Sequence, residues 1–284
     1  MAAFVAFAGL ALVKSTPLIF AALAGVMCER SGILNIALEG ALTVGAFAAV
    51  CVAFATGSPL LGLAAGVLAG ALLCGVLGVA ATRFGVDQIV AGTGLNLMAA
   101  GGTAFGIAVV FGVPGASPEV PALGARGEIA LIVLAFACAL GFQFALDRTP
   151  WGLRLRACGE NPRAVASAGV DPRRVRLIAT ILGGALAGLG GVYLSLGELD
   201  LYSDGMTAGR GFIALAAVIF GRWTPLGATG AALAFGALSA LQFILQRSGV
   251  PSELMQALPY LAALAALTGI VGRARAPKAD GVSL

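Results

Sequence analysis

Apolar runs of about 20 residues follow one another along almost the whole chain, and they restrict its fold more than any other feature. A helix of that length crosses the hydrocarbon core of a bilayer, which is roughly 30 Å thick. Hydrophobic residues make up 60% of the 284 residues and charged residues only 11%. A soluble domain needs roughly a quarter of its residues charged. The sequence therefore predicts an all-α, polytopic membrane protein that forms a single domain, 1–284.

The runs predict about nine transmembrane helices, within a range of about eight to ten. The expected spans are 3–28, 34–56, 58–81, 86–111, 128–146, 177–196, 209–222, 226–246 and 256–272. The first run holds Lys14 and Pro17, so it is either a kinked helix or two shorter pieces, and the run 209–222 is short. Short or broken membrane helices are typical of transport proteins, where protein or a water-filled cavity surrounds them.

A basic segment, 147–176, sets the predicted orientation. Lys and Arg accumulate in cytoplasmic loops, and this segment carries seven arginines against three acidic residues. The cytoplasmic side is expected to hold 147–176, 29–33, 82–85, the region around Arg222 and the tail after Gly272. The outer side then holds 112–127, 197–208 and 247–255, with the N-terminus outside and the C-terminus inside. The accumulation of basic residues on the cytoplasmic side explains the pI near 9.0 better than binding to nucleic acid does.

Glycines spaced four residues apart predict close helix packing. They are Gly62, Gly66 and Gly70; Gly102 and Gly106; and Gly184 and Gly188. Small residues at this spacing let helix backbones approach each other closely. Such close packing stabilises helix association in lipid, where there is no hydrophobic driving force for it.

The sequence contains no catalytic or ATP-binding motif. It has no histidine, and its five cysteines are scattered, so we expect packing cysteines rather than disulfides or metal ligands. The G-x-x-x-x-G-K-[ST] pattern of a phosphate loop is absent. We therefore expect a protein that is not an enzyme, carries no metal or cofactor, and relies on another chain for any use of ATP.

Polar residues inside the apolar runs are the candidate pathway residues, because such residues are costly in a membrane. Asn35 and Glu39 are four apart and are expected on one helix face, after a helix break at Ser31-Gly32. Gln88 and Asn96 belong to a second cluster. A third, weaker pair, Gln242 and Gln246, is expected to be structural or interfacial.

Three of these residues have a functional and a structural interpretation. In the functional interpretation, Glu39 lines the pathway or makes an essential buried hydrogen bond near it. In the structural interpretation, it only bonds to a neighbouring helix or lies near the headgroups. Asn35 and Asn96 either line the pathway or fasten helices together, since Asn is a common interhelical fastener.

Four stretches carry a resemblance to a known family. The segment 29–47, ERSGILNIALEGALTVGAF, resembles the N-terminal signature of ABC-importer permeases that take up nucleosides and purines, relatives of the ribose and branched-chain amino-acid permeases. The segments 86–96 (VDQIVAGTGLN), 156–170 (RACGENPRAVASAGV) and 209–223 (GRGFIALAAVIFGRW) resemble the same family, in the same order. Two features depart from it: Asp87 stands where Asn or another polar residue is expected, and the N-terminal segment is short.

The resemblance implies a permease-like bundle in the bacterial inner membrane. It implies a second permease subunit, identical or homologous, around a central pathway. It also implies an ATPase subunit that carries the ATP and magnesium, an extracytoplasmic binding protein, and a nucleoside or base as substrate. Nucleic acid is not among the implied partners.

The segment 160–169 matches the family's coupling helix, which docks on the ATPase. The residues assigned to this role are Glu160, Asn161, Arg163, Ala164, Ala168 and Gly169. Glu160 or Asn161 is a suitable cap, Pro162 suits a first helical turn, and Gly169 suits the end. The competing interpretation is a solvated loop whose arginines only fix orientation.

Two other functions stay open. One is an ABC permease for sugars or branched-chain amino acids. The other is an ion-coupled secondary transporter, against which the absence of histidine and the few intramembrane acids count.

Overall fold

The computed structural model describes residues 2–245 and 275–282, and every regular element in these ranges is a helix. The elements are α1 (Ala2–Ser31), α2 (Leu38–Thr56), α3 (Pro59–Arg83), α4 (Gln88–Phe111), α5 (Gly124–Arg148), α6 (Pro150–Glu160), α7 (Pro162–Ser167), α8 (Pro172–Val192), the π-helix η1 (Tyr193–Leu199), α9 (Arg210–Phe220) and α10 (Pro225–Leu245). Seven helices in the described part are long and apolar enough to cross a membrane, and α9 is a shorter apolar helix. The all-α, multi-pass architecture is confirmed. The expected span 256–272 and Gln246 lie outside the described residues.

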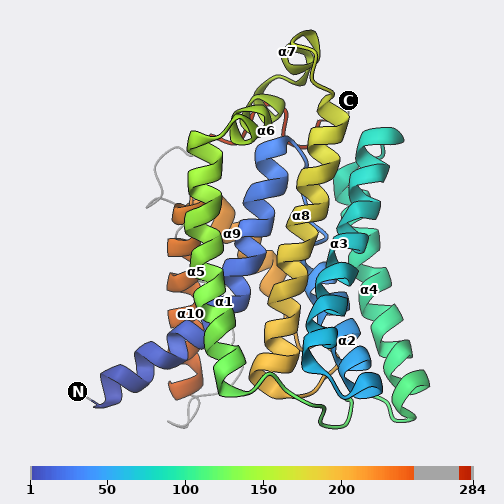
Figure 1. Ribbon diagram of the computed structural model, residues 1–284, viewed down its shortest axis with the longest axis vertical. Helices are drawn as coiled ribbons and strands as arrows, with labels where there is room; N and C mark the ends of the chain where they lie inside the picture. Colours follow the sequence, from blue (N-terminus) through green and yellow to red (C-terminus); the bar gives the residue numbers. More distant parts are fainter. Residues whose placement is uncertain (1, 246–274, 283–284) are drawn as a thin grey trace.

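The long helices stand side by side, while α6 and α7 project beyond one end of the bundle (Figure 1). At that end Arg30 Nε donates to the carbonyl of Trp223 (2.6 Å), and the amide of Ala279 donates to Gly159 (2.8 Å). At the other end the loops after α4 and after η1 are joined, since the amide of Ser117 donates to the carbonyl of Tyr202 (2.8 Å). The loops are therefore grouped at the two ends as the charge pattern predicts.

Helix α1 runs through the centre of the bundle as one continuous helix, although it contains Pro17. Figure 1 shows its first part turned away from the rest. Ser15 and Thr16 each donate a hydroxyl hydrogen bond to the carbonyl four residues earlier, a local bond that often accompanies a bend. Lys14, the other unusual residue of this run, pairs with Glu198 in η1. The kinked-helix alternative is the correct one.

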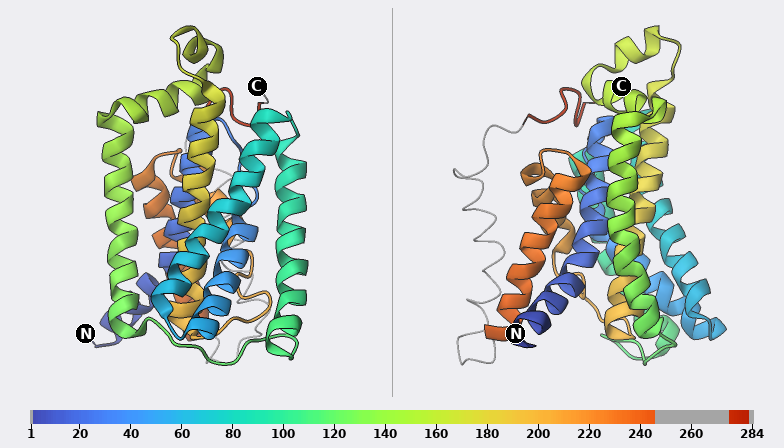
Figure 2. Two further views of the ribbon diagram at one scale, coloured as in Figure 1. Left: turned by 45° about the vertical axis from the view of Figure 1, so that its right-hand side comes forward. Right: turned by 60° about the vertical axis from the view of Figure 1, so that its left-hand side comes forward.

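Glycines set the contact between α3 and α8, which pack against each other along much of their length (Figure 2). A Cβ placed on Gly70 would lie 2.4 Å from the carbonyl oxygen of Gly184 in α8. One on Gly66 would lie 2.6 Å from the carbonyl oxygen of Gly45 in α2, so α3 also approaches α2 closely. A Cβ on Gly188 would lie 2.5 Å from the carbonyl oxygen of Gly66. The predicted close approach is confirmed here.

The same prediction is wrong for Gly102 of α4, around which the described residues leave open space. Its partner in the pattern, Gly106, does meet a neighbour, because a Cβ there would lie 2.6 Å from Cζ of Phe47. Spacing alone does not reveal which side of a helix carries a neighbour.

We predict that Gly70→Val lowers the thermal stability of the purified protein. The added side chain would overlap backbone atoms of α8, and overpacking of this kind costs about 1–3 kcal/mol. The matched control is Gly141→Val in α5, where nothing lies within 4 Å of the would-be Cβ. Melting followed by fluorescence-detected gel filtration is the measurement; equal melting temperatures for the two variants would contradict the packing account.

Candidate functional site

A break separates α1 from α2 inside the bundle. Helix α1 ends at Ser31, Gly32 takes a left-handed conformation (φ +94°), and helical structure resumes only at Leu38. A Cβ on Gly32 would lie 2.4 Å from a guanidinium nitrogen of Arg176, so glycine is required for space as well as for conformation. The expected helical start at 34 is therefore wrong. Asn35 lies in the break, and it does not share a helix face with Glu39.

Two polar side chains of α4 hold this break. Gln88 Oε1 accepts a hydrogen bond from the amide of Leu34 (2.7 Å). Asn96 Oδ1 accepts from the amide of Gly40 (2.7 Å), and its Nδ2 donates to the carbonyl of Ile36 (2.9 Å). Asn96 thus satisfies backbone groups that the missing helical turn leaves unpaired at the start of α2.

Asn35 is fully buried between α1 and α3. Its Nδ2 lies 3.3 Å from Sγ of Cys28 and 3.4 Å from Sγ of Cys74. Its Oδ1 and the Nε2 of Gln88 are buried without a partner among the described residues. We call Asn35, Glu39, Gln88 and Asn96 the helix-break cluster, since all four predicted pathway residues gather around the same interruption.

Glu39, the fourth member, joins α2 to the short helix α9. Its Oε1 accepts from the amide of Gly209 (2.8 Å) and its Oε2 from the amide of Gly211 (2.7 Å). Both carboxylate oxygens therefore bond to amides at the N-terminus of α9, where unpaired N–H groups favour negative charge. A Cβ on Gly211 would lie 2.4 Å from the backbone nitrogen of Glu39, so the two helix starts are almost in contact.

The segment that leads into α9 returns to the interior of the bundle. Thr207 in this segment lies within hydrogen-bond distance of Thr43 in α2, with 3.1 Å between the hydroxyl oxygens. The expectation that 197–208 stays entirely at the outer end is therefore wrong for its last residues.

The far end of α9 is held by the end of α1. Trp223 Nε1 donates to the buried carboxylate of Glu29 (2.5 Å), and Arg30 Nε donates to the carbonyl of Trp223 (2.6 Å). Trp223 and Arg222 both have positive φ, so the chain turns sharply after α9. Sequence reasoning missed this contact, although the adjacent charges Glu29 and Arg30 at the end of an apolar run were visible.

Helices α6 and α7 form the projection that we call the coupling arm, Pro150–Ser167. Asn161 separates them: its amide donates to Ala157, and its Oδ1 accepts from the amide of Ala164 (3.2 Å) at the first turn of α7. Gly169, in a left-handed conformation (φ +80°), follows the end of α7. The predicted short helix, its Asn161 cap and its end are confirmed. Glu160 does not start this helix, because it is the last residue of α6.

The predicted coupling residues lie on the outside of the arm. Glu160, Asn161, Arg163, Ala164, Ala168 and Gly169 are all exposed. Ala164 and Ala168 border a hollow of about 470 Å³ between α6 and α7, together with Leu153, Ala157 and Val165. The arm therefore presents an apolar hollow rimmed by polar side chains.

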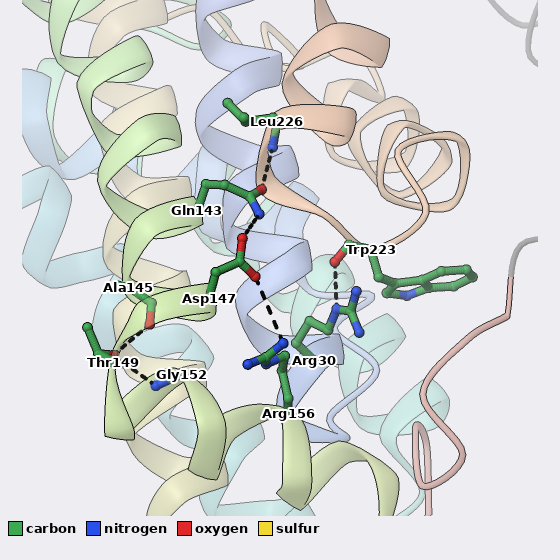
Figure 3. Close-up of polar contacts among 9 residues, drawn as sticks. All are labelled: Arg30, Gln143, Ala145, Asp147, Thr149, Gly152, Arg156, Trp223 and Leu226. Carbon is green, nitrogen blue, oxygen red and sulfur yellow. Dashed lines mark hydrogen bonds and ion pairs between the residues drawn. The ribbon is translucent and has the colours of Figure 1, made fainter.

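The base of the arm is fixed to the bundle (Figure 3). Thr149 caps α6 by accepting from the amide of Gly152 (3.1 Å). Asp147 lies 3.9 Å from Arg156 and accepts from Gln143 Nε2 (2.5 Å), and Gln143 Oε1 in turn accepts from the amide of Leu226 at the start of α10. The arm is thereby linked to α5 and α10.

Arg176 anchors the tail beneath the arm. It is 1% exposed, and its guanidinium donates to the carbonyls of Ser31, Ala279 and Val282. Arg176 therefore holds the structure together, whereas the sequence suggests only a solvated charge that sets the orientation of the protein in the membrane. Burial raises the pKa of the neighbouring carboxyl of Asp280 to about 7, with Arg176 opposing the shift.

Known protein sequences match this chain over most of its length. The model of a family described as "Branched-chain amino acid transport system / permease component" matches residues 7–267. The chain belongs to this permease family. The resemblance of the four stretches is thereby confirmed, and the protein is a permease subunit of an ABC transporter.

Two relatives match the permease over nearly its full length. The guanosine ABC transporter permease protein NupQ of Bacillus subtilis is 39% identical, over 95% of this chain and 93% of its own. The nucleoside ABC transporter permease protein NupC of Lactococcus lactis is 36% identical, over 96% and 94%. A putative glucose ABC transporter permease protein, TsgC13 of Haloferax volcanii, is 34% identical over 80% and 74%. No solved structure gives a significant match.

We predict that Asn96→Ala destabilises the permease by about 1–3 kcal/mol, because it leaves the amide of Gly40 and the carbonyl of Ile36 unpaired inside the bundle. Asn96→Asp keeps the acceptor for Gly40 but loses the donor, so it should fall between the wild type and Asn96→Ala. Thr93→Ala is the control on the same helix, since the Thr93 hydroxyl donates only to the carbonyl of Ile89, one turn earlier in α4. Thermal melting in detergent is the measurement, and the idea fails if Asn96→Ala melts like Thr93→Ala.

Proposed function

We propose that this permease forms, with a second permease subunit, the membrane pathway of an ATP-driven importer of nucleosides. The observation that carries the proposal is the likeness, over nearly the full length, to one permease named for guanosine and another named for nucleosides. An extracytoplasmic binding protein would deliver the nucleoside, and a separate ATPase subunit would bind ATP and magnesium in the cytoplasm.

The helix-break cluster is the proposed contact with the pathway. Glu39 and Asn96 keep part of their surface exposed, so substrate or pathway water is able to reach them. Asn35 and Gln88 are buried, and in this proposal they position the break without touching substrate. Broken helices of this kind are where transporters bind their substrates, because the free ends offer polar backbone groups.

The coupling arm is the proposed ATPase contact. Its exposed small residues, Ala164 and Ala168, would allow close docking. Its base is tied to α5 by the Arg156–Asp147 ion pair, and Gln143 of α5 is bonded to the start of α10. A short helix held in this way transmits a rigid-body displacement to the bundle. The arm would then face the cytoplasm, as its arginines favour.

Two other substrates are possible within the family. The likeness to a putative glucose permease supports a sugar, and the family description supports a branched-chain amino acid. Membership of the family counts against an ion-coupled transporter, which would carry out uptake without an ATPase.

Uptake into vesicles separates these alternatives. The permease is co-purified with its ATPase and binding protein and reconstituted, and ATP hydrolysis and uptake are measured with guanosine, adenosine, uridine, glucose and leucine. We expect nucleosides to stimulate both activities, with no requirement for an ion gradient. Stimulation by glucose or leucine alone would replace the proposed substrate, and gradient-driven uptake without ATP would overturn the proposed mechanism.

We predict that Ala164→Glu uncouples the permease from its ATPase. A carboxylate buried without a partner in an interface costs several kcal/mol, so uptake and ATPase co-purification should each fall by about tenfold or more. Ala125→Glu is the matched control, an exposed alanine at the opposite end of α5. If Ala164→Glu and Ala125→Glu retain equal uptake and equal ATPase binding, the arm is only a solvated connection.

A further inference from the structure

An apolar groove runs along the outer face of α3 and α8. It has a volume of about 590 Å³, and its lining includes Leu68, Leu72, Gly75, Val76 and Ile181. From Leu68 to Val79 the groove follows 12 residues of α3, a rise of about 17 Å. A groove of that length and character, open to the bilayer, suits an extended acyl chain.

A basic hollow adjoins this groove at the end that carries the coupling arm. It measures about 200 Å³ and is lined by Arg83, Arg173 and Arg174. Val79 and Leu177 line both hollows, so the two form one continuous surface. Arg83 ends α3, and the other two arginines lie in the first turn of α8.

The charge of the basic hollow is largely uncompensated. Arg174 lies 3.4 Å from Asp171, whereas Arg83 and Arg173 make no ion pair within the described residues. Asp87, the residue before α4, caps that helix with one carboxylate oxygen, which accepts from the amides of Ile89 and Val90, and it makes no ion pair within the described residues. Only one of the three guanidinium groups is therefore ion-paired, at the end of α3 and the start of α8, where a membrane helix is expected to meet the headgroups.

We propose that this composite surface, Leu68–Arg83 of α3 with the Arg173–Ile181 part of α8, binds an anionic glycerophospholipid. The arginines would hold the phosphate, as guanidinium groups do in charge-assisted pairs, while an acyl chain lies in the apolar groove. A zwitterionic lipid fits less well, because its own ammonium group would add to three nearby positive charges. The groove faces the bilayer in this proposal, so phospholipid molecules are available to bind in it.

Native mass spectrometry of the full-length permease, co-purified with its ATPase, tests this site. The probes are tetraoleoyl cardiolipin and dioleoyl phosphatidylglycerol, with dioleoyl phosphatidylethanolamine as the zwitterionic comparison. Replacing Arg83, Arg173 and Arg174 together by alanine should weaken binding of the anionic lipids by roughly 10- to 100-fold. Replacing the same three by lysine should restore most of it.

Two matched controls separate the site from general charge and general surface effects. Alanine at Arg148, Arg154 and Arg222 removes the same charge from exposed positions at the same end of the bundle and should leave lipid binding unchanged. Gly75→Leu fills the groove, since its Cβ would be in ordinary contact with Ile181 at 3.4 Å, and it should weaken binding where Gly141→Leu does not.

Three results would overturn the proposal. The first is an equal loss of lipid in the two arginine triples. The second is displacement of the lipid by inorganic phosphate at matched ionic strength, which would mean that the hollow binds the free anion. The third is a disulfide-linked permease dimer formed through Leu72→Cys, which would mean that a second copy covers the groove.

Discussion

Where a helix is interrupted inside a membrane, the backbone N–H and C=O groups of the break have no water to bond to. The structure depends on how the groups at two such interruptions are hydrogen-bonded. One lies between α1 and α2, and the other precedes α9. Asn96 supplies a donor and an acceptor to the first, and Glu39 supplies two acceptors to the second. Because Glu39 itself belongs to the first turn of α2, the two breaks form one unit.

This unit is connected to the coupling arm. Helix α9 has only 11 residues and is held at one end by Glu39 and at the other by Glu29 and Arg30 of α1. The end of α1 in turn touches the arm, since a Cβ on Gly159 would lie 2.4 Å from the carbonyl oxygen of Arg30. A displacement of the arm therefore has a path of direct contacts, through Arg30, to the Trp223 end of α9, and α9 itself joins that end to Glu39. That path is the physical basis for proposing that the arm and the helix-break cluster belong to one mechanism.

Much of this arrangement could be predicted from local chemistry. Apolar length predicted the spans, four-residue glycine spacing predicted that α3 and α8 each pack closely against a neighbour, and Asn161 before Pro162 predicted the start of α7. These features depend on neighbours in the sequence or on one helix face. Charge bias likewise grouped the described loops correctly at the two ends, apart from the last residues of 197–208.

Tertiary partners could not be predicted in the same way. The polar pattern marked Asn35 but suggested a helix, since nothing local shows that Gln88 and Asn96 hold the backbone open there. Arg176 looked like one more orienting charge, whereas the carbonyls that bury it come from Ser31 and from the tail. Such contacts join residues more than 50 positions apart, and one sequence without its fold does not pair them.

Amide hydrogen exchange at Gly209 and Gly211 tests the central claim most directly. In Glu39→Gln one carboxylate oxygen becomes an NH₂ group that faces a backbone N–H, so one of the two hydrogen bonds is lost. Exchange of the peptide that spans 207–213 is compared between wild type, Glu39→Gln and the control Thr93→Ala, each in the assembled complex. The account predicts faster exchange in Glu39→Gln alone, by about tenfold, as expected for a loss near 1.4 kcal/mol. Unchanged protection of this peptide in Glu39→Gln would contradict it.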